Sequence, residues 1–264
     1  MKKYRIISED RLEELVAERS RDYAQKTSQS YQQELLKRQV YMKALQNQIN
    51  PHFLYNTLEC IRGQALLYDA KEIADTAQTL SRFFRYSINT SSDIVTLRDE
   101  LSNVKDYMKI QQYRFKDRFY LTVNVEDTEE DLLLARIPKL TFQPIVENAI
   151  THAFTDKLKF NNISIEIKAS SRHIRIVISD DGKGIEEPVL KKLNRELQDQ
   201  DLSGELENGA QASPSDSHNG IALGNVNQRI KLYFGAEYGL SVTSVPGMGT
   251  DVELYIPKQM RDED

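Results

Sequence analysis

The first part of the chain has a helical pattern of apolar and polar positions with almost no helix breakers. Residues 8–118 contain one glycine, Gly63, and one proline, Pro51. A short heptad-like stripe runs through Leu35, Met42, Leu45 and Ile49. Because residues seven apart lie on one face of a helix, we expect residues 8–50 to form a long helix that pairs with another helix.

After Pro51 the apolar residues recur at regular helical intervals, which predicts a helical hairpin. The first helix has apolar positions at intervals of four, three and four residues, namely Leu54, Leu58, Ile61 and Ala65. On a second face His52, Asn56 and Glu59 form a polar stripe with helical spacing. A second amphipathic helix follows over about residues 70–89. Such a hairpin exposes its apolar stripe, so we expect it to dimerise into a four-helix bundle.

The proline before His52 has two interpretations. Proline lacks a backbone donor and clashes with the preceding turn, so Pro51 would interrupt a long helix and loosen it where His52 is presented. Alternatively, Pro51 marks the first turn of a new helix, where proline is tolerated.

One more helix is expected after the hairpin. Thr96 and Asp99 have the spacing of a capping box, with Asp in place of the usual Glu or Gln. The apolar face that follows consists of Leu97, Leu101, Val104 and Met108. Ordinary packing explains this segment, and we assign it no chemistry.

From Phe119 onward the apolar period changes to two. Alternating, β-branched runs predict five strands, "FYLTVNV", "ISIEIKA", "HIRIVIS", "LSVTSV" and "DVELYI". Between the first two lies "PKLTFQPIVENAITHAF", whose spacing predicts a helix. Arg172 lies in a short turn that joins the second and third strands as a hairpin. The fold class we expect is multidomain, α and α+β, with a helical domain followed by an α/β sandwich.

Three stretches of this second half carry candidate chemistry. In "VENAITHAF", Asn148 and His152 are four residues apart and share one helical face, and an Asn amide oxygen suits Mg²⁺. In "SDDGKGI", Asp180 is followed by Gly182 and Gly184, which allow a tight turn at the end of a strand. The third stretch, "HNGIALGNVNQRI", places two glycines before an amphipathic helix, where exposed amides can hold phosphates; these are Gly220 and Gly224.

Two further segments complete this set. The polar stretch between Ile185 and Asn219 predicts a lid over a nucleotide, because long segments without structure in compact domains are often functional. The turn "PGMGT", with Gly247, Gly249 and Thr250, joins the last two strands. Its glycines either contact a ligand or satisfy only the geometry of a hairpin.

Composition narrows the setting. The chain has 264 residues, enough for one or two domains, and a net charge of −5, which argues against direct nucleic-acid binding. Its single cysteine, Cys60, permits no internal disulfide and indicates a reducing compartment. No apolar run is long enough to span a membrane and no export signal is present, so we expect a cytoplasmic chain.

The central and C-terminal stretches together resemble one family. The heptapeptide "NPHFLYN" at residues 50–56 is identical to the phosphoacceptor motif of a subgroup of sensor histidine kinases. The boxes "ENAITH", "DDGKG", "GIALGN" and "PGMGT" resemble, in the same order, the ATP-binding Bergerat fold shared by gyrase, heat-shock chaperones, histidine kinases and MutL. The resemblance covers about residues 45–257. It divides the chain into a signalling helix at 1–44, dimerisation and phosphotransfer helices at 45–118, and an ATP-binding domain at 119–264.

The resemblance implies a role for each box. His52 would receive the γ-phosphoryl group of ATP and pass it to an aspartate of a response regulator. In the nucleotide site, Asp180 would accept the adenine amino group and Asn148 would help to bind Mg²⁺. The remaining candidates are Asn56 and Glu147 for local polar chemistry, and Gly182, Gly184, Gly220, Gly224, Gly249 and Thr250 for the walls of the nucleotide site. His152 either contacts a phosphate or packs.

This sequence departs from the family at three positions. Phe53 follows His52 where many histidine kinases have an acidic residue, so the general base is unassigned, and Glu59 is two turns away. Pro144 stands four residues before Asn148, where hydrolysing relatives have a Glu that positions water. Ala222 replaces the middle glycine of the lid motif.

The family implies a homodimer and a membrane-anchored parent protein whose sensor portion lies outside this sequence. Two alternatives stay open. One is an ATP-hydrolysing relative of the same fold, against which the intact "NPHFLYN" and Pro144 both argue. The other is a dimeric scaffold that signals by helix rearrangement with little or no kinase activity, which Phe53 and Ala222 leave possible.

Overall fold

The computed structural model describes residues 51–89, 92–116, 118–126, 130–153, 161–199 and 217–258. The described residues from Tyr55 onward belong to one compact unit, and residues 51–54 are treated by themselves. The long helix expected over residues 8–50 lies outside the described residues. Within the described ranges, no helix combines the length and apolarity needed to cross a bilayer.

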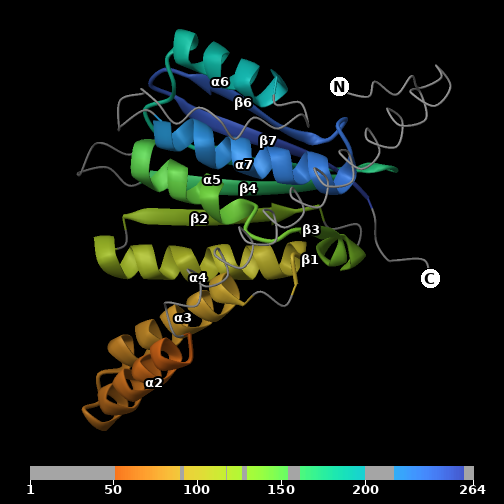
Figure 1. Ribbon diagram of the computed structural model, residues 1–264. Coiled ribbons are helices and arrows are strands. Elements are labelled where there is room, and N and C mark those ends of the chain that lie inside the picture. The colour runs from red at the N-terminus through yellow and green to blue at the C-terminus, as the bar shows by residue number, and fades with distance from the viewer. Residues whose placement is uncertain are drawn as a thin grey trace, which may run out of the picture. The chain divides into compact units, whose positions relative to one another are not determined.

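The predicted helical hairpin is present. It consists of α2 (Pro51–Leu67) and α3 (Lys71–Ile88), which lie side by side in Figure 1. The Tyr55 hydroxyl donates to the Phe84 carbonyl at 3.4 Å, which ties the start of one helix to the end of the other. Small and apolar residues are buried in both helices, namely Leu58, Ala65, Ala74 and Ala77. Ile61 and Ile73, in contrast, are 44% and 46% exposed, so the hairpin leaves apolar surface uncovered as expected.

Helix α4 (Leu97–Phe115) begins where the capping box predicted. The Thr96 hydroxyl accepts from the Asp99 amide at 3.1 Å, and the Asp99 carboxylate accepts from the Thr96 amide at 3.1 Å, so aspartate performs the usual role of Glu. Leu97 and Val104 are fully buried in the same core as the sheet. Helix α4 therefore packs as part of the sandwich.

All five predicted strands are present and form one sheet. They are β2 (Phe119–Val125), β4 (Asn161–Ala169), β5 (His173–Asp180), β6 (Gly239–Val245) and β7 (Gly249–Pro257), in the order β2-β4-β5-β7-β6. β2 and β4 pair in parallel and the other neighbours are antiparallel. A small antiparallel sheet of β1 (Ile94–Thr96) and β3 (Arg136–Pro138), which the sequence did not predict, lies at the start of α4. A short 3₁₀-helix, η1 (Glu130–Leu134), precedes β3.

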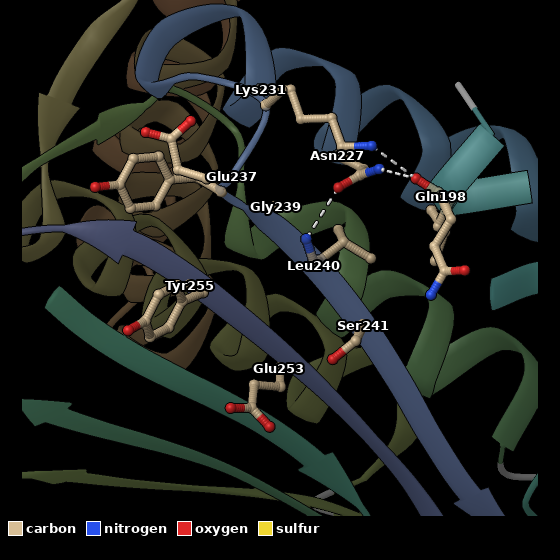
Figure 2. A pocket seen from close by; sticks show the side chains of 12 residues that line it. Gln198, Asn227, Lys231, Glu237, Gly239, Leu240, Ser241, Glu253 and Tyr255 are labelled. Carbon is tan, nitrogen blue, oxygen red and sulfur yellow. Dashed lines mark hydrogen bonds between the residues drawn. The ribbon is translucent and has the colours of Figure 1, made fainter. Parts of the chain in front are cut away.

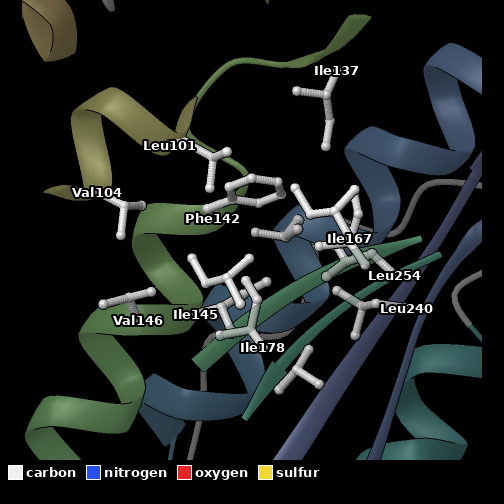
Figure 3. Packing of buried hydrophobic residues seen from close by; sticks show 14 of the residues in the cluster. Leu101, Val104, Ile137, Phe142, Ile145, Val146, Ile167, Ile178, Leu240 and Leu254 are labelled. Atoms are coloured by element: carbon white, nitrogen blue, oxygen red, sulfur yellow. The ribbon is translucent and has the colours of Figure 1, made fainter. Parts of the chain in front are cut away.

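Helices cover one face of this sheet (Figure 1). Alternate residues of the central strands, such as Ile165, Ile176 and Leu254, are fully buried, whereas their neighbours are half-buried or exposed. Figure 3 shows Phe142 of α5 (Phe142–Asn148) and Leu101 of α4 directed into this core. The structure is thus a helical region followed by an α/β sandwich, and the predicted fold class is confirmed.

Two segments differ from the prediction. Residues 187–199, assigned to the lid, form the helix α6 (Glu187–Asp199), because Leu193 and Leu197 are buried against the core. The helix expected from Pro138 to Phe154 is shorter, since its α-helical part begins at Phe142 and ends at Asn148. It continues as a π-helix, η2 (Ala149–Ala153).

Candidate functional site

Asp180 ends β5 and begins the predicted glycine turn. Its half-buried carboxylate accepts hydrogen bonds from the Gly182 amide at 2.9 Å and from the Thr250 amide. Burial raises the pKa of Asp180 to about 6, and the nearby carboxylates of Asp181 and Asp251 add to this shift. A partly desolvated carboxylate with a raised pKa is typical of a functional position.

The glycine turn and the "PGMGT" turn form one packed unit. Gly184 has φ +70°, and a β-carbon there would lie 2.2 Å from the Val245 carbonyl oxygen. Gly249 has φ +119°, and its β-carbon would lie 1.9 Å from the Asp180 carbonyl oxygen. The Gly247 amide donates to the Lys183 carbonyl at 2.7 Å. Backbone packing alone therefore requires glycine at 184 and 249.

Ser244 ties the two turns together. Its hydroxyl accepts from the Ile185 amide at 2.8 Å and donates to the Gly249 carbonyl at 2.7 Å. The Thr250 hydroxyl lies 3.0 Å from the Ser244 hydroxyl oxygen. Sequence reasoning missed Ser244, because a serine in an alternating strand carries no separate signal.

Asn148 is the last residue of α5, and its side-chain Nδ2 is buried with no hydrogen-bond partner among the described residues. A buried amide without a partner is costly in a folded protein, so the side chain fits a site that a ligand completes. Glu147 beside it is exposed. The following π-helix η2 contacts β7, the strand that carries Thr250. Single π-turns of this kind are frequent at functional sites.

The other candidates for the nucleotide site, His152, Gly220 and Gly224, lie partly elsewhere than the sequence predicted. His152 lies in η2, where the α-helical spacing that put it on one face with Asn148 no longer applies, and its side chain is outside the described residues. Gly220 and Gly224 were expected before a helix, which is wrong. Helix α7 (Ser217–Phe234) contains both, and Gly224 is buried within it. Only Gly220 falls within the first four residues, whose amides have no partner inside the helix.

His52 is exposed on α2, and Asn56 is exposed on the same helix. Phe53 is 69% exposed. Glu59 accepts a hydrogen bond from the Arg62 Nε at 2.8 Å, and this contact lowers the pKa of the Glu59 carboxyl. Glu59 is therefore a poor candidate for a base. Whether Pro51 interrupts a helix or begins one stays open, since residues 1–50 lie outside the described ranges.

A separate hollow of about 390 Å³ lies where α7 meets β6 and β7 (Figure 2). Two of its polar side chains, Lys231 and Asn227, are hydrogen-bonded within the protein. Lys231 Nζ and Asn227 Nδ2 both donate to the Leu197 carbonyl, at 2.9 and 2.7 Å, and Asn227 Oδ1 accepts from the Leu240 amide at 2.9 Å. Because the buried Asn227 and the half-buried Lys231 already have partners within the protein, we assign no ligand to this hollow.

Two families match the chain in sequence. Residues 40–119 match the family described as histidine kinase, and residues 135–260 match the histidine kinase-, DNA gyrase B- and HSP90-like ATPases. The second match includes β5, the glycine turn, α5 and α7.

Curated relatives match over most of this chain. Sensor histidine kinase YesM of Bacillus subtilis is 34% identical over 229 residues, which is 87% of this chain and 35% of that protein. Sensor histidine kinase/phosphatase LytS of Staphylococcus aureus is 33% identical over 225 residues, 84% of this chain and 35% of that protein. This chain thus spans about a third of the length of these relatives. Among solved structures, the histidine kinase domain of a blue-light activated histidine kinase from Erythrobacter litoralis aligns over 79% of this chain and 94% of that chain, at 14% identity and a TM-score of 0.41.

Proposed function

This chain belongs to the histidine kinase family, and from that premise we propose that it is the kinase portion of a two-component sensor. It binds ATP, phosphorylates itself on His52 and passes the phosphoryl group to an aspartate of a response regulator. Residues 1–44 serve as the signalling helix, 45–118 as dimerisation and phosphotransfer helices, and 119–264 as the ATP-binding domain. Helix α4, the last helix of the middle segment, packs on the ATP-binding domain and joins the two. The unchanged "NPHFLYN" supports membership of the subgroup with that motif.

The exposed position of His52 is the observation that carries this proposal. A phosphoacceptor must meet first ATP and then the regulator, so its ring has to be accessible from solvent. Imidazole is a competent nucleophile near neutral pH. His52 meets both requirements, and an ATPase-family domain follows it in the same chain.

Asp180, Gly182 and the "PGMGT" turn form the adenine end of the proposed site. The Asp180 carboxylate is held by two backbone amides and accepts the adenine amino group. Gly182 leaves room beside it for a flat base. Gly249 and Thr250 shape the far wall through their contacts with Asp180 and Ser244.

Asn148 serves the phosphate end. The described residues contain no cluster of three or more His, Cys, Asp or Glu that would bind a metal by themselves. Mg²⁺ does not need such a cluster, because it is usually held by one or two protein oxygens together with phosphates and water. The ion would neutralise charge on the phosphates. Since Mg²⁺ takes oxygen ligands, the side-chain oxygen of Asn148 would hold the ion, and its unpartnered Nδ2 can donate to a phosphate oxygen. Glu147, His152 and Gly220 complete the proposed site, whereas Gly224, which is buried within α7, is left out of it.

The transfer step uses one ring nitrogen of His52. That nitrogen forms a bond to the γ-phosphorus while the bond from this phosphorus to the bridging oxygen breaks, and ADP leaves with the electron pair. The ring then releases its remaining proton to water, because Phe53 follows the histidine and Glu59 is engaged by Arg62. Asn56, four residues further along the sequence, is the second polar residue that we assign to this step.

The proposal includes a homodimer and a membrane-anchored parent. The uncovered apolar residues of the hairpin, Ile61 and Ile73, suit a second copy of the helical pair. The two curated relatives are sensor proteins nearly three times as long as the matched region, so a sensor portion outside this sequence fits the same assignment.

Incubation with γ-labelled ATP and Mg²⁺ tests the function. We expect an acid-labile, alkali-stable label on the wild type and none on His52→Gln. His173→Gln is the matched control, because His173 stacks on Tyr255 at 4.7 Å in the sheet and should not change labelling. Folded, ATP-binding wild type that takes no label would favour the scaffold alternative, and label that persists in His52→Gln would identify another acceptor.

A further inference from the structure

Glu100 of α4 is fully buried, and all of its acceptor capacity is used. One carboxylate oxygen accepts from the Tyr86 hydroxyl at 2.5 Å and from the Leu140 amide at 2.6 Å. The other accepts from the amides of Thr141 and Phe142, both at 2.8 Å. A buried carboxylate is retained only where it is hydrogen-bonded in this way.

These bonds make Glu100 the cap of α5. The first amides of a helix have no partner within the helix and need an outside acceptor. Thr141 precedes α5, yet its side chain makes no capping bond, because its hydroxyl donates to the Pro138 carbonyl at 2.5 Å. A carboxylate from another helix therefore caps α5 in place of Thr141. The direction of α5 thus depends on where α4 holds Glu100.

Leu140 shows how firmly the turn before α5 is held. It has φ +59°, a conformation that leucine rarely adopts and that persists only when its surroundings impose it. Its amide is bound by Glu100, and its carbonyl accepts from Arg229 Nη2 of α7 at 2.8 Å. Two ionisable residues from different helices, Glu100 and Arg229, thus hold both polar groups of one strained residue.

Helix α3 and its C-cap reach the same turn through three contacts. Tyr86 donates to Glu100, and the Lys139 amine lies 4.8 Å from the centre of the Tyr86 ring. The same amine donates to the carbonyl of Asn89, the C-cap residue that follows α3, at 2.5 Å. The second helix of the phosphotransfer hairpin is therefore bonded to the base of α5. Asn148 lies at the other end of α5, about 9 Å away at the usual helical rise.

We propose that Glu100 and Tyr86 are positioning residues that couple the position of α3 to the orientation of the ATP-binding helix α5. The inference rests on the proposed function, since it assigns α5 to nucleotide binding. Movement of α3 shifts the Tyr86 hydroxyl, Glu100 follows, and the turn at Leu140 transmits the change to Asn148. The coupling works in both directions, because an equilibrium coupling between two sites is reciprocal.

Hydrogen–deuterium exchange measures this coupling without relying on catalysis. The probe is a non-hydrolysable ATP analogue with Mg²⁺, and the readout is the exchange of amides in the last turn of α3, residues 85–88. Wild-type exchange should slow by about fivefold or more when the analogue binds. In Tyr86→Phe the ring remains but the bond to Glu100 is lost, so the analogue should still bind while the slowing disappears.

Kinetics supply the second readout. Initial rates of autophosphorylation over a range of ATP concentrations separate the maximal rate from KM. Tyr86→Phe should lower the maximal rate about fivefold or more and leave KM within about twofold, because the groups proposed to contact ATP are unchanged. Tyr238→Phe, which alters a ring packed on Phe234 and Tyr255, is the control and should behave as wild type.

The outcomes separate this inference from the function beneath it. The coupling is overturned if analogue binding slows amide exchange in the last turn of α3 equally in wild type and Tyr86→Phe. It is also overturned if exchange slows in neither protein, even if His52 is labelled. If the slowing of amide exchange is present in wild type and lost in Tyr86→Phe, the coupling is supported even without a phosphohistidine. In that case only the proposed kinase activity is rejected. A wild type that binds no analogue overturns both. If Tyr86→Phe does not fold, Lys139→Met removes the other two contacts and should weaken the slowing.

Discussion

The backbone of Gly249 passes so close to Asp180 that a β-carbon at position 249 would lie 1.9 Å from the Asp180 carbonyl oxygen. This contact joins the start of β7 to the end of β5, next to the carboxylate assigned to adenine. The glycine is therefore needed for the shape of the site before any ligand binds.

Gly249→Ala should reduce the free energy of unfolding by about 3 kcal/mol or more, because backbone atoms must move to admit the methyl group. Gly247→Ala is the matched variant in the same turn. Its φ of +79° is also unfavourable for alanine, but nothing lies within 4 Å of its β-carbon, so the loss should be about 1 kcal/mol. Urea unfolding of both variants measures the difference. Equal losses would show that the close contact with Asp180 has no energetic weight.

Glu100→Gln should destabilise the protein by about 3 kcal/mol, since an amide replaces one acceptor oxygen and leaves buried backbone donors without a partner. Asp99→Asn alters the neighbouring, exposed acid, which caps α4, and should cost about 1 kcal/mol or less. Thermal or urea unfolding would report both. A smaller loss for Glu100→Gln than for Asp99→Asn would contradict the buried cap.

Nucleotide affinity should depend on the protonation of Asp180. Burial raises the pKa of this carboxyl to about 6, so it is ionised at pH 7 and protonated at pH 5. An ionised acceptor binds an amino donor more strongly, and affinity for an ATP analogue should fall by up to about tenfold between pH 7 and pH 5. Titration calorimetry at several pH values tests this. Asp180→Asn should bind more weakly at pH 7 and show a flatter profile.

The same carboxyl affects stability without nucleotide. Its folded-state pKa of about 6 lies above the ordinary 3.8, so between these values the folded protein binds a proton that the unfolded chain has released. The contribution of Asp180 to the free energy of unfolding therefore becomes less favourable as the pH rises from about 4 to about 6, and is constant above that. Asp180→Asn should gain stability relative to wild type over this interval. A constant difference between the two proteins across it would refute the shift.

Two bidentate arginine–carboxylate pairs should differ in their energetic contribution because they differ in burial. Arg82 of α3 holds Asp106 of α4 at 2.9 and 3.0 Å, and only 13% of the Asp106 side chain is exposed. Arg82→Met should cost about 2 kcal/mol, since it leaves a mostly buried carboxylate unpaired. Arg175 and Glu253 pair on the open face of the sheet, where both are more than a third exposed, so Arg175→Met should cost less than about 1 kcal/mol. Unfolding in high salt, which screens exposed charges, should change the second loss more than the first.

The regular elements were predictable because the alternation of apolar and polar residues continues without interruption along each of them. The strand runs correspond to β2, β4, β5, β6 and β7 within one or two residues, and Thr96 with Asp99 correctly marked the start of α4. Helix α6 was missed, since a polar composition outweighed Leu190, Leu193 and Leu197, whose spacing of three and four is helical. That spacing was the available signal.

The role of Glu100 could not be predicted from the spacing of apolar residues alone. It lies on the same helical face as Leu97, Leu101 and Val104, and a carboxylate on an apolar face is the sequence signal for a buried acceptor. Its partners at 140–142 lie some forty residues away, so the cap required the tertiary structure. The change from α- to π-helix after Asn148 had no sequence signal that we recognise.

The place of β7 in the sheet has a consequence for how this domain reaches its native state. β7 is the last strand of the described residues, yet it lies between β5 and β6, and it pairs His173 with Pro257 across more than eighty residues of sequence. Contacts so distant in sequence form slowly, and the central ladder cannot close on a ribosome until β7 has been synthesised. Until then β5 and β6 each present an open edge, and a chain cut short within β7 should aggregate rather than persist as a smaller folded kinase.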